Sequence, residues 1–279
     1  MLNGFQGPLW LVGCGAMGGA LLSRWRAAGL RDDQVTVIDP APKAVPAGFA
    51  GILVDSPDAA SGTPRLVVLG VKPQMLPVVA ASLSARIAGA LLISMLAGVR
   101  TGTLANLFDR ARIARIMPNT PASIGAGVTA LYGAGLPAAD MAMVEALLKP
   151  AGQTLWLEDE SRFDAVTALS GSGPAYVFRF IEALAGAGEA AGLDAATAGA
   201  LAMATVTGAA ALAAQSGETP AALRLAVTSP QGTTQAGLDV LDGDGALSAL
   251  LRGTVRAAAE RSRALAAAAD AAADAKAAA

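Results

Sequence analysis

Residues 9–25 read LWLVGCGAMGGALLSRW, an apolar run that passes through closely spaced glycines into a segment of helical character. Gly13, Gly15 and Gly18 form a Gly-x-Gly-x-x-Gly pattern. The first glycine of such a pattern permits a tight turn, the second lets the backbone approach a pyrophosphate, and the third lets helix and strand pack closely. The N-terminus of the helix adds unpaired N–H groups that bind phosphate. The stretch predicts the opening of a dinucleotide-binding domain, the alternative being a tight turn without a ligand.

A carboxylate follows the second predicted strand, about 20 residues beyond the last glycine of the pattern. Asp39 at this position is expected to accept hydrogen bonds from the adenosine ribose hydroxyls and to repel a 2′-phosphate. We therefore predict a bias toward NADH over NADPH. Two alternatives stay open: Asp39 caps a turn before Pro40, or Lys43 pairs with a phosphate and offsets the repulsion.

The pattern around this stretch predicts an α/β domain followed by helices. Apolar, β-branched runs lie at 9–13, 34–39, 66–71, 90–95, 111–117, 128–132 and 154–159, with room for helices between them. Such alternation predicts a Rossmann-like domain over residues 1–160, with a mainly parallel sheet covered on both faces. Residues 161–279 are predicted to form an all-α domain, whose low-complexity tail is expected to fray from about residue 270.

Composition excludes several classes of function. The 279 residues carry a net charge of −2 without a cluster of cations, which argues against nucleic acid. The chain has no histidine and one cysteine, Cys14, so we expect no metal site, no disulfide framework and a reducing, cytoplasmic compartment. Residues 195–214 carry no charge and are long enough to span a membrane, but they are mostly Ala, Gly and Thr. We expect a buried helix of a soluble protein rather than a membrane span.

Three further loops follow predicted strands, at residues 70–74, 94–98 and 117–121. Ligands of open parallel sheets bind beyond the carboxyl ends of the strands, so these loops are candidate cofactor contacts. Asn119 lies between two prolines, which would hold its amide in a rigid frame. The alternatives are ordinary strand terminators and, for Lys72, a surface lysine.

Five motifs together resemble one known family. VGCGAMG, VKPQ, MPNTPASIGAGVTALY, ALSGSGPAYVF and AVTSPQGTTQAGL occur in the order and spacing of the pyrroline-5-carboxylate reductases. The resemblance covers about residues 8 to 268. The sequence departs from the family pattern at Gln231, where a glycine is usual, and in the segment IDPAPK at residues 38–43.

The resemblance implies a Rossmann-like domain, a helical domain that intertwines into a homodimer, and assembly of dimers into decamers. It also implies hydride transfer from NADPH or NADH to the C=N carbon of 1-pyrroline-5-carboxylate, which gives L-proline in the last step of proline biosynthesis. Matching motifs assign Ser229, Gly232 and Thr233 to the substrate carboxylate and Thr234, as the catalytic residue, to the ring nitrogen. The implied cofactor contacts are Gly13, Gly15, Ala16, Met17, Gly18, Val71, Lys72, Pro73 and Asn119, beside Asp39.

The chemistry read from the residues agrees with this resemblance. An imine carbon is already electrophilic, so its reduction needs a hydride donor and good placement rather than a strong base. The SPQGTTQAGL loop, residues 229–238, opens a helix, where free N–H groups and threonine hydroxyls bind a small carboxylate or simply cap the helix. The SGSGP segment, residues 170–174, is expected either to lie against the cofactor or to act as a hinge.

Three other classes of protein are alternatives to this family. β-Hydroxyacid dehydrogenases share the two-domain layout but use a lysine at the start of the second domain, and residues 150–275 contain none. A non-catalytic NAD(H)-binding regulator would need an effector surface, such as a basic patch, which the sequence lacks. Another imine or 2-oxo-acid reductase remains an alternative.

Overall fold

The computed structural model describes residues 2–277, which form two compact units. Unit 1 runs to Ser172 and resumes at Ala258, and unit 2 comprises Gly173–Ala257. The chain therefore forms most of unit 1 first and then unit 2, and its last helix begins in unit 2 and ends in unit 1.

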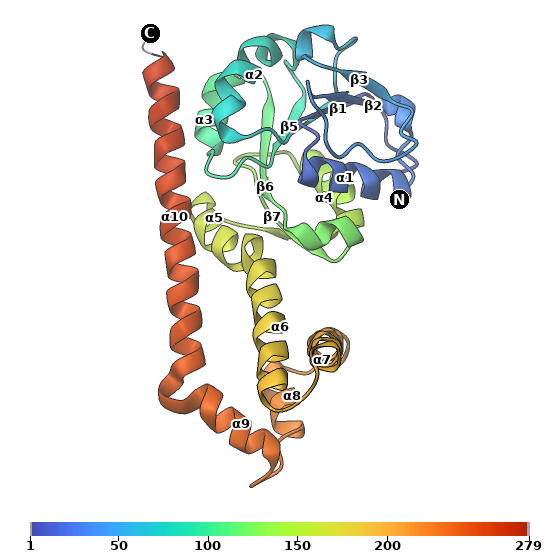
Figure 1. The fold of residues 1–279 in the computed structure, drawn as a ribbon. Coiled ribbons are helices and arrows are strands. Elements are labelled where there is room, and N and C mark those ends of the chain that lie inside the picture. Colours follow the sequence, from blue (N-terminus) through green and yellow to red (C-terminus); the bar gives the residue numbers. More distant parts are fainter. Residues whose placement is uncertain (1, 278–279) are drawn as a thin grey trace. The chain divides into compact units, whose positions relative to one another are not determined.

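Unit 1 contains an eight-stranded sheet of order β3-β2-β1-β4-β5-β6-β7-β8. The strands are β1 (Leu9–Val12), β2 (Val35–Ile38), β3 (Ile52–Val54), β4 (Leu66–Leu69), β5 (Leu91–Ser94), β6 (Arg112–Met117), β7 (Gly127–Tyr132) and β8 (Gly152–Trp156). All neighbouring strands pair parallel except β6 and β7. Figure 1 shows β1 inside the sheet with helices on both sides. The predicted Rossmann-like domain with a mainly parallel sheet is confirmed.

Two features of the sheet differ from the sequence-based prediction. The edge strand β3 was missed because it has only three residues and its side chains are exposed or half-buried. The pair β6–β7 is antiparallel because a short 3₁₀ turn, Thr120–Ile124, connects the strands. A parallel connection would need a crossover of a dozen or more residues.

The helices of unit 1 pack on three apolar clusters, two large ones on opposite faces of the sheet and a small one around Phe163. They are α1 (Ala16–Ala27), α2 (Leu76–Leu83), α3 (Thr101–Leu107), α4 (Ala138–Leu148) and α5 (Phe163–Val166). Successive side chains of a strand point to opposite faces, so Leu11 lies in the core with α1 and α4, whereas Trp10 lies in the core with α2 and α3. Helices therefore cover β1 on both faces, which explains why this strand is apolar at every position. The same packing holds in place the turn that follows β1.

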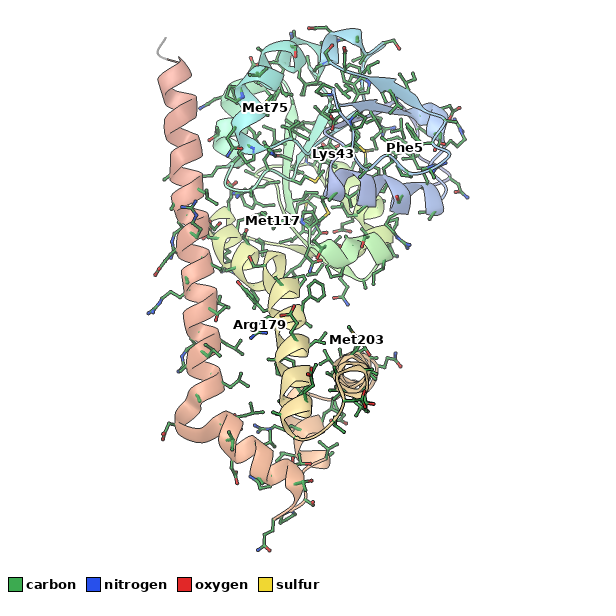
Figure 2. The ribbon with its side chains drawn as sticks, in the orientation of Figure 1. Phe5, Lys43, Met75, Met117, Arg179 and Met203 are labelled. Atoms are coloured by element: carbon green, nitrogen blue, oxygen red, sulfur yellow. The ribbon has the colours of Figure 1, made fainter. Side chains whose placement is uncertain are left out.

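Unit 2 is helical, and most of its apolar side chains are exposed. Its helices are α6 (Gly173–Ala190), α7 (Ala195–Gln215), α8 (Pro220–Ala226), α9 (Thr233–Asp242) and the first part of α10 (Ala246–Ala277). In α7 only Ala198 and Ala202 are buried, and Figure 2 shows side chains such as Met203 projecting from it. The predicted burial of this helix is therefore not reached within a single chain, in which α6 is its main packing partner, and it stays a prediction for the dimer.

Length and hydropathy alone make Ala195–Gln215 the single candidate membrane span among the described residues, which is weak evidence. At the end of the chain, α10 continues to Ala277, past residue 270 where fraying was expected. Alanine has the highest helix propensity, which accounts for the continued helix. Residues 278–279 lie outside the described residues.

Candidate functional site

The turn between β1 and α1 requires glycine at two of its three patterned positions. Gly13 has φ +93°, and a Cβ there would lie 2.6 Å from the carbonyl oxygen of Gly70. A Cβ at Gly18 would lie 2.5 Å from the carbonyl oxygen of Gly13. Real Cβ atoms do not approach backbone this closely, so both glycines are needed by packing inside the chain.

Gly15 differs, because nothing in the chain lies within 4 Å of the place its Cβ would occupy. It is the N-cap of α1, where no side chain caps the helix and no acidic residue lies in the first turn. Gly15 and Ala16 are exposed, and Met17 is half-buried. The open space and free N–H groups form a cradle that fits the pyrophosphate of a dinucleotide.

Asp39 is held by the turn itself. One of its carboxylate oxygens accepts a hydrogen bond from the backbone N–H of Cys14 at 2.7 Å, and the other accepts from the N–H of Ala41 at 2.9 Å. Each oxygen has a second lone pair, so the half-buried carboxylate keeps acceptor capacity for ribose hydroxyls. Asp39 is thus a turn cap, and this role leaves room for the predicted one.

The side chain of Cys14 is buried beneath this turn. Burial, and then the negative charge of Asp39, raise the pKa of the Cys14 thiol to about 11. The backbone carbonyl of Cys14 accepts N–H groups from Lys43 at 3.3 Å and Ala44 at 3.2 Å. The loop after β2 therefore folds over the glycine turn, with the side chain of Lys43 exposed.

The loop after β4 meets the glycine turn from the neighbouring strand. The N–H of Gly70 donates to the carbonyl of Val12 at 2.7 Å, and the backbone nitrogen of Val71 lies 2.9 Å from the place that a Cβ at Gly13 would occupy. Val71 and Pro73 are half-buried, whereas Lys72 is exposed. The structure thus brings the predicted cofactor residues of β1 and β4 together at the carboxyl ends of their strands.

Asn119 is buried at the end of β6, and its amide is engaged within unit 1. Its side-chain oxygen accepts from the N–H of Val128 at 2.9 Å, and its side-chain nitrogen donates to the carbonyl of Ser170 at 3.2 Å. Ser170 belongs both to a π-helical turn, Thr167–Gly171, and to the SGSGP segment, residues 170–174. Asn119 therefore fixes this segment against the sheet and retains one amide hydrogen for another acceptor.

The predicted substrate residues lie in unit 2, in the loop that opens α9. Ser229, Thr233 and Thr234 are exposed, and Gly232 is the N-cap of α9 without a side-chain cap. The N–H of Gly232 donates to the carbonyl of Ser229 at 3.0 Å. Gln231 adopts a left-handed conformation with φ +60°, which favours glycine. The free N–H groups and hydroxyls at this helix start are chemically suited to a carboxylate.

For several residues of the cofactor region, the contacts were not predicted from the sequence. A Cβ at Gly19 would collide with the carbonyl oxygen of Ala44, and one at Gly70 with the methyl group of Met95. Gly19 lies directly after Gly18, so the double glycine was an available signal. The contacts of Gly70 and Ser170 join segments that are distant in the sequence, and no local pattern indicates them.

This combination of fold and turn defines a dinucleotide-binding protein of the Rossmann type. Residues 9–98 match the family described as NADP oxidoreductase coenzyme F420-dependent. Residues 160–265 match the pyrroline-5-carboxylate reductase dimerisation family. The two matches fall on the sheet domain and on the helical region, respectively.

Comparison with known proteins is more specific. The chain is 40% identical over 261 residues to the pyrroline-5-carboxylate reductase of Pseudomonas aeruginosa, covering 91% of this chain and 95% of that protein. The structure of the reductase from Coxiella burnetii is similar with a TM-score of 0.86 at 30% identity, covering 93% and 98% of the two chains. The Plasmodium falciparum reductase, whose structure contains NADP, gives a TM-score of 0.82 at 27% identity, covering 94% and 98%.

The chain belongs to the pyrroline-5-carboxylate reductase family. It is an oxidoreductase that reduces pyrroline-5-carboxylate to proline, and its helical region is the dimerisation domain of the family.

Proposed function

We propose how this chain divides the reaction between its two units. The glycine turn of unit 1 holds the dinucleotide pyrophosphate through Gly13, Gly15, Ala16, Met17 and Gly18. The observation that carries this proposal is the open space at Gly15 beside packed Gly13 and Gly18. Only the glycine that faces outward has no partner inside the chain.

The remaining cofactor contacts follow from the same edge of the sheet. We assign Val71, Lys72 and Pro73 to the border of the ribose and Asn119 to that of the nicotinamide. The remaining amide hydrogen of Asn119 is available to an acceptor, since its other polar contacts are fixed by Val128 and Ser170. When bound, the reduced dinucleotide supplies the hydride that an imine carbon accepts.

The loop that opens α9 binds and orients the substrate in this proposal. Ser229, Gly232 and Thr233 hold the carboxylate through hydroxyl and N–H donors at the start of the helix. Thr234 places its hydroxyl at the ring nitrogen, where hydrogen bonding favours the polarised imine. No strong base is required, which agrees with a chain that contains no histidine.

The reaction is tested by the oxidation of NADH and NADPH in the presence of pyrroline-5-carboxylate. We expect oxidation that depends on enzyme and substrate with at least one of the two cofactors. Oxidation no faster than the enzyme-free control with both cofactors would remove the proposed reaction.

Thr234 is tested by a pair of substitutions. Thr234→Val removes the hydroxyl at nearly constant volume and is expected to lower kcat/KM by roughly 100-fold, the scale of one positioned proton donor. Thr234→Ser retains the hydroxyl and should restore most of the activity. Equal losses in both variants would assign Thr234 to packing or helix capping instead.

We further propose that Asp39 biases the enzyme toward NADH. A carboxylate near a 2′-phosphate disfavours it by roughly 1–3 kcal/mol in a partly solvated site, or about 5- to 150-fold in relative kcat/KM. Asp39→Asn removes the charge but keeps an oxygen for the Cys14 N–H. Asp39→Ser replaces the carboxylate with a single, shorter hydroxyl.

The two Asp39 variants separate charge from capping. If the charge sets selectivity, both variants shift the NADPH/NADH ratio of kcat/KM upward and leave the KM for pyrroline-5-carboxylate nearly unchanged. A shift in Asp39→Ser alone would indicate a capping effect, and an unchanged ratio in both would refute the selectivity argument.

The proposed functional unit is at least a homodimer in the cytoplasm. The exposed apolar side chains of unit 2 support assembly, and the buried, unpaired Cys14 suits a reducing compartment. Sedimentation velocity distinguishes a dimer from a decamer. A stable, active monomer would contradict the proposed assembly.

A further inference from the structure

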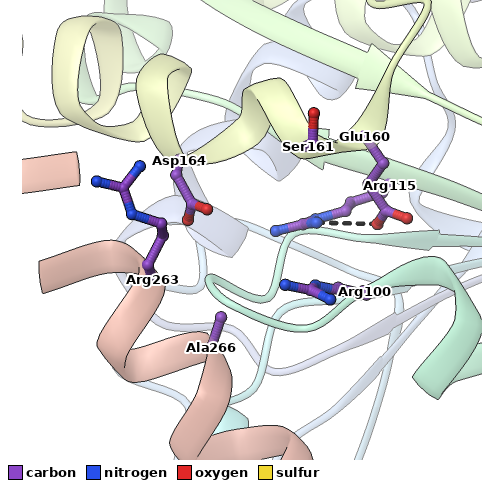
Figure 3. A pocket seen from close by; sticks show the side chains of 7 residues that line it. All are labelled: Arg100, Arg115, Glu160, Ser161, Asp164, Arg263 and Ala266. Carbon is purple, nitrogen blue, oxygen red and sulfur yellow. Dashed lines mark hydrogen bonds and ion pairs between the residues drawn. The ribbon is translucent and has the colours of Figure 1, made fainter. Parts of the chain in front are cut away.

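A polar cavity of about 450 Å³ lies in unit 1, apart from the glycine turn. It is lined by Arg100, Arg115, Glu160, Ser161, Asp164, Arg263 and Ala266. Figure 3 shows that these residues come from the N-cap of α3, from β6, from α5 and the segment leading into it, and from α10. None of them belongs to the proposed cofactor or substrate contacts.

Arg115 forms the inner wall of this cavity. Its side chain is 5% exposed, it forms an ion pair with Glu160 at 2.8 Å, and its guanidinium lies 4.2 Å from the ring centre of Phe163. The Nε atom of Arg115 is buried and has no hydrogen-bond partner within the described part of the chain. An unsatisfied buried donor costs free energy; because Nε has almost no accessible surface, an occupant of the cavity would contact only the terminal guanidinium nitrogens of Arg115.

The acidic residues of the cavity are already engaged. Both carboxylate oxygens of Glu160 accept hydrogen bonds from Thr101, one from its backbone N–H at 2.8 Å and one from its hydroxyl at 2.7 Å. Asp164 accepts from the hydroxyl of Ser262 at 2.6 Å. Glu160 is also neutralised by Arg115, so the cavity keeps an excess of positive charge.

Arg100 supplies that excess at the cavity wall. Its guanidinium makes no hydrogen bond or ion pair to any side chain placed in the structure, and its side chain does not cap α3. In Figure 3 the guanidinium groups of Arg100 and Arg115 lie on the same side of the cavity. Guanidinium groups bind the oxygens of carboxylates and phosphates through paired N–H donors.

We propose that this cavity is a binding site for a small oxyanion, a carboxylate or a phosphate, held mainly by Arg100 and Arg115. The site lies next to the segment that carries Asn119's partner: α5 begins at Phe163, and the π-helical turn that follows contains Ser170. An occupant that contacts Ser161 or Asp164 therefore binds the start of this segment. At the other end of the segment, the carbonyl of Ser170 accepts the hydrogen bond from Asn119. This position suits an effector rather than a substrate.

The test is calorimetric titration of the NADPH-saturated enzyme with inorganic phosphate and, separately, with succinate. We expect saturable binding of at least one of the two probes, which also identifies the class of oxyanion. Arg100→Gln should weaken that binding by at least about 10-fold, as expected for loss of a charged hydrogen bond. Asp164→Asn keeps an acceptor for Ser262 but removes a negative charge, so it should tighten binding a few-fold.

Arg31→Gln is the matched control, because Arg31 forms an exposed ion pair with Asp33 and does not line the cavity. The Arg31→Gln variant should bind the oxyanion probes with the same affinity as the wild type. Absence of saturable binding of both probes up to about 10 mM, a weak affinity by any standard, would overturn the proposal. Binding that survives Arg100→Gln unchanged would also overturn it, since the oxyanion would then occupy another site.

Discussion

The two ligand loops of this molecule differ in how much of their structure one chain determines. The turn at Gly13–Gly18 is packed against the loop after β4, and Asp39 holds it by a hydrogen bond to Cys14. The loop at residues 229–234 is mostly exposed, and the hydrogen bonds that hold it are local. The turn proposed to hold the dinucleotide is thus built within one chain, whereas the proposed substrate loop has few contacts in a single chain.

The same contrast holds for the two units as a whole. The strands β1, β2, β4 and β5 of unit 1 have side chains with almost no exposure, as at Leu11 and Ile93. Unit 2 exposes large apolar side chains, among them Phe178 at 59%, Leu201 at 53% and Val240 at 77%. An exposed apolar surface on this scale marks an interface, in agreement with the dimerisation family that matches residues 160–265.

Breaking the assembly is expected to have the largest effect. Leu201→Glu places a charge on the exposed apolar surface of α7, where burial in the interface would leave it unpaired. We expect the variant to dissociate and to lose nearly all activity, while the sheet of unit 1 stays folded. Sedimentation velocity and circular dichroism measure the two parts of this prediction.

A matched variant on the same helix controls for the added charge. Gln215→Glu introduces the same charge at the last, exposed residue of α7, without removing an apolar side chain. It should remain assembled and active. If Leu201→Glu also stays assembled, the surface around Leu201 is not part of the interface.

The glycine turn gives the next largest effect, through a pair of alanine substitutions. Gly13→Ala combines a φ of +93° with a Cβ 2.6 Å from a carbonyl oxygen, so we expect a stability loss of at least about 2 kcal/mol. Gly15→Ala meets no atom of the chain, so its stability should change by less than about 1 kcal/mol. Denaturant unfolding measures both values.

Gly15→Ala, the milder of the two substitutions for folding, should have a clear effect on dinucleotide binding. Gly15→Ala is expected to fold normally yet bind the dinucleotide at least about 10-fold more weakly, because its methyl group occupies the space proposed for the pyrophosphate. Fluorescence titration with NADH measures this affinity. Normal affinity in Gly15→Ala would show that the open space at Gly15 is not the cradle.

The sequence predicted what depends on local pattern. Apolar runs located β1, β2 and β4, and the glycine spacing predicted the turn after β1. The antiparallel β6–β7 pair follows from the length of a connection, which required the boundaries of both strands. The exposure of α7 in a single chain could not be predicted, because apolar composition does not say which chain covers the helix.

Contacts between distant segments could not be predicted in this way. The hydrogen bond from Asn119 to Ser170 spans 51 residues, and the one from Ser262 to Asp164 spans 98. Neither residue type carries a pattern that selects its partner. The cavity around Arg115 depends on such contacts, and no motif in the sequence pointed to it.

Gln231 gives the smallest expected effect and tests the substrate loop. Gln231→Gly relieves a left-handed conformation but raises the entropy of the unfolded chain, so stability should rise by no more than about 1 kcal/mol. Asp244, with φ +51°, is the matched control, and Asp244→Gly should give a similar change. Only Gln231→Gly is expected to change the KM for pyrroline-5-carboxylate, because it alone lies between Ser229 and Thr233.

Steady-state kinetics and denaturant unfolding on both variants test these expectations. An equal KM in the two variants would show that Gln231 does not influence the substrate. A large loss of stability in Gln231→Gly would show that the side chain of Gln231, rather than its backbone, stabilises the loop.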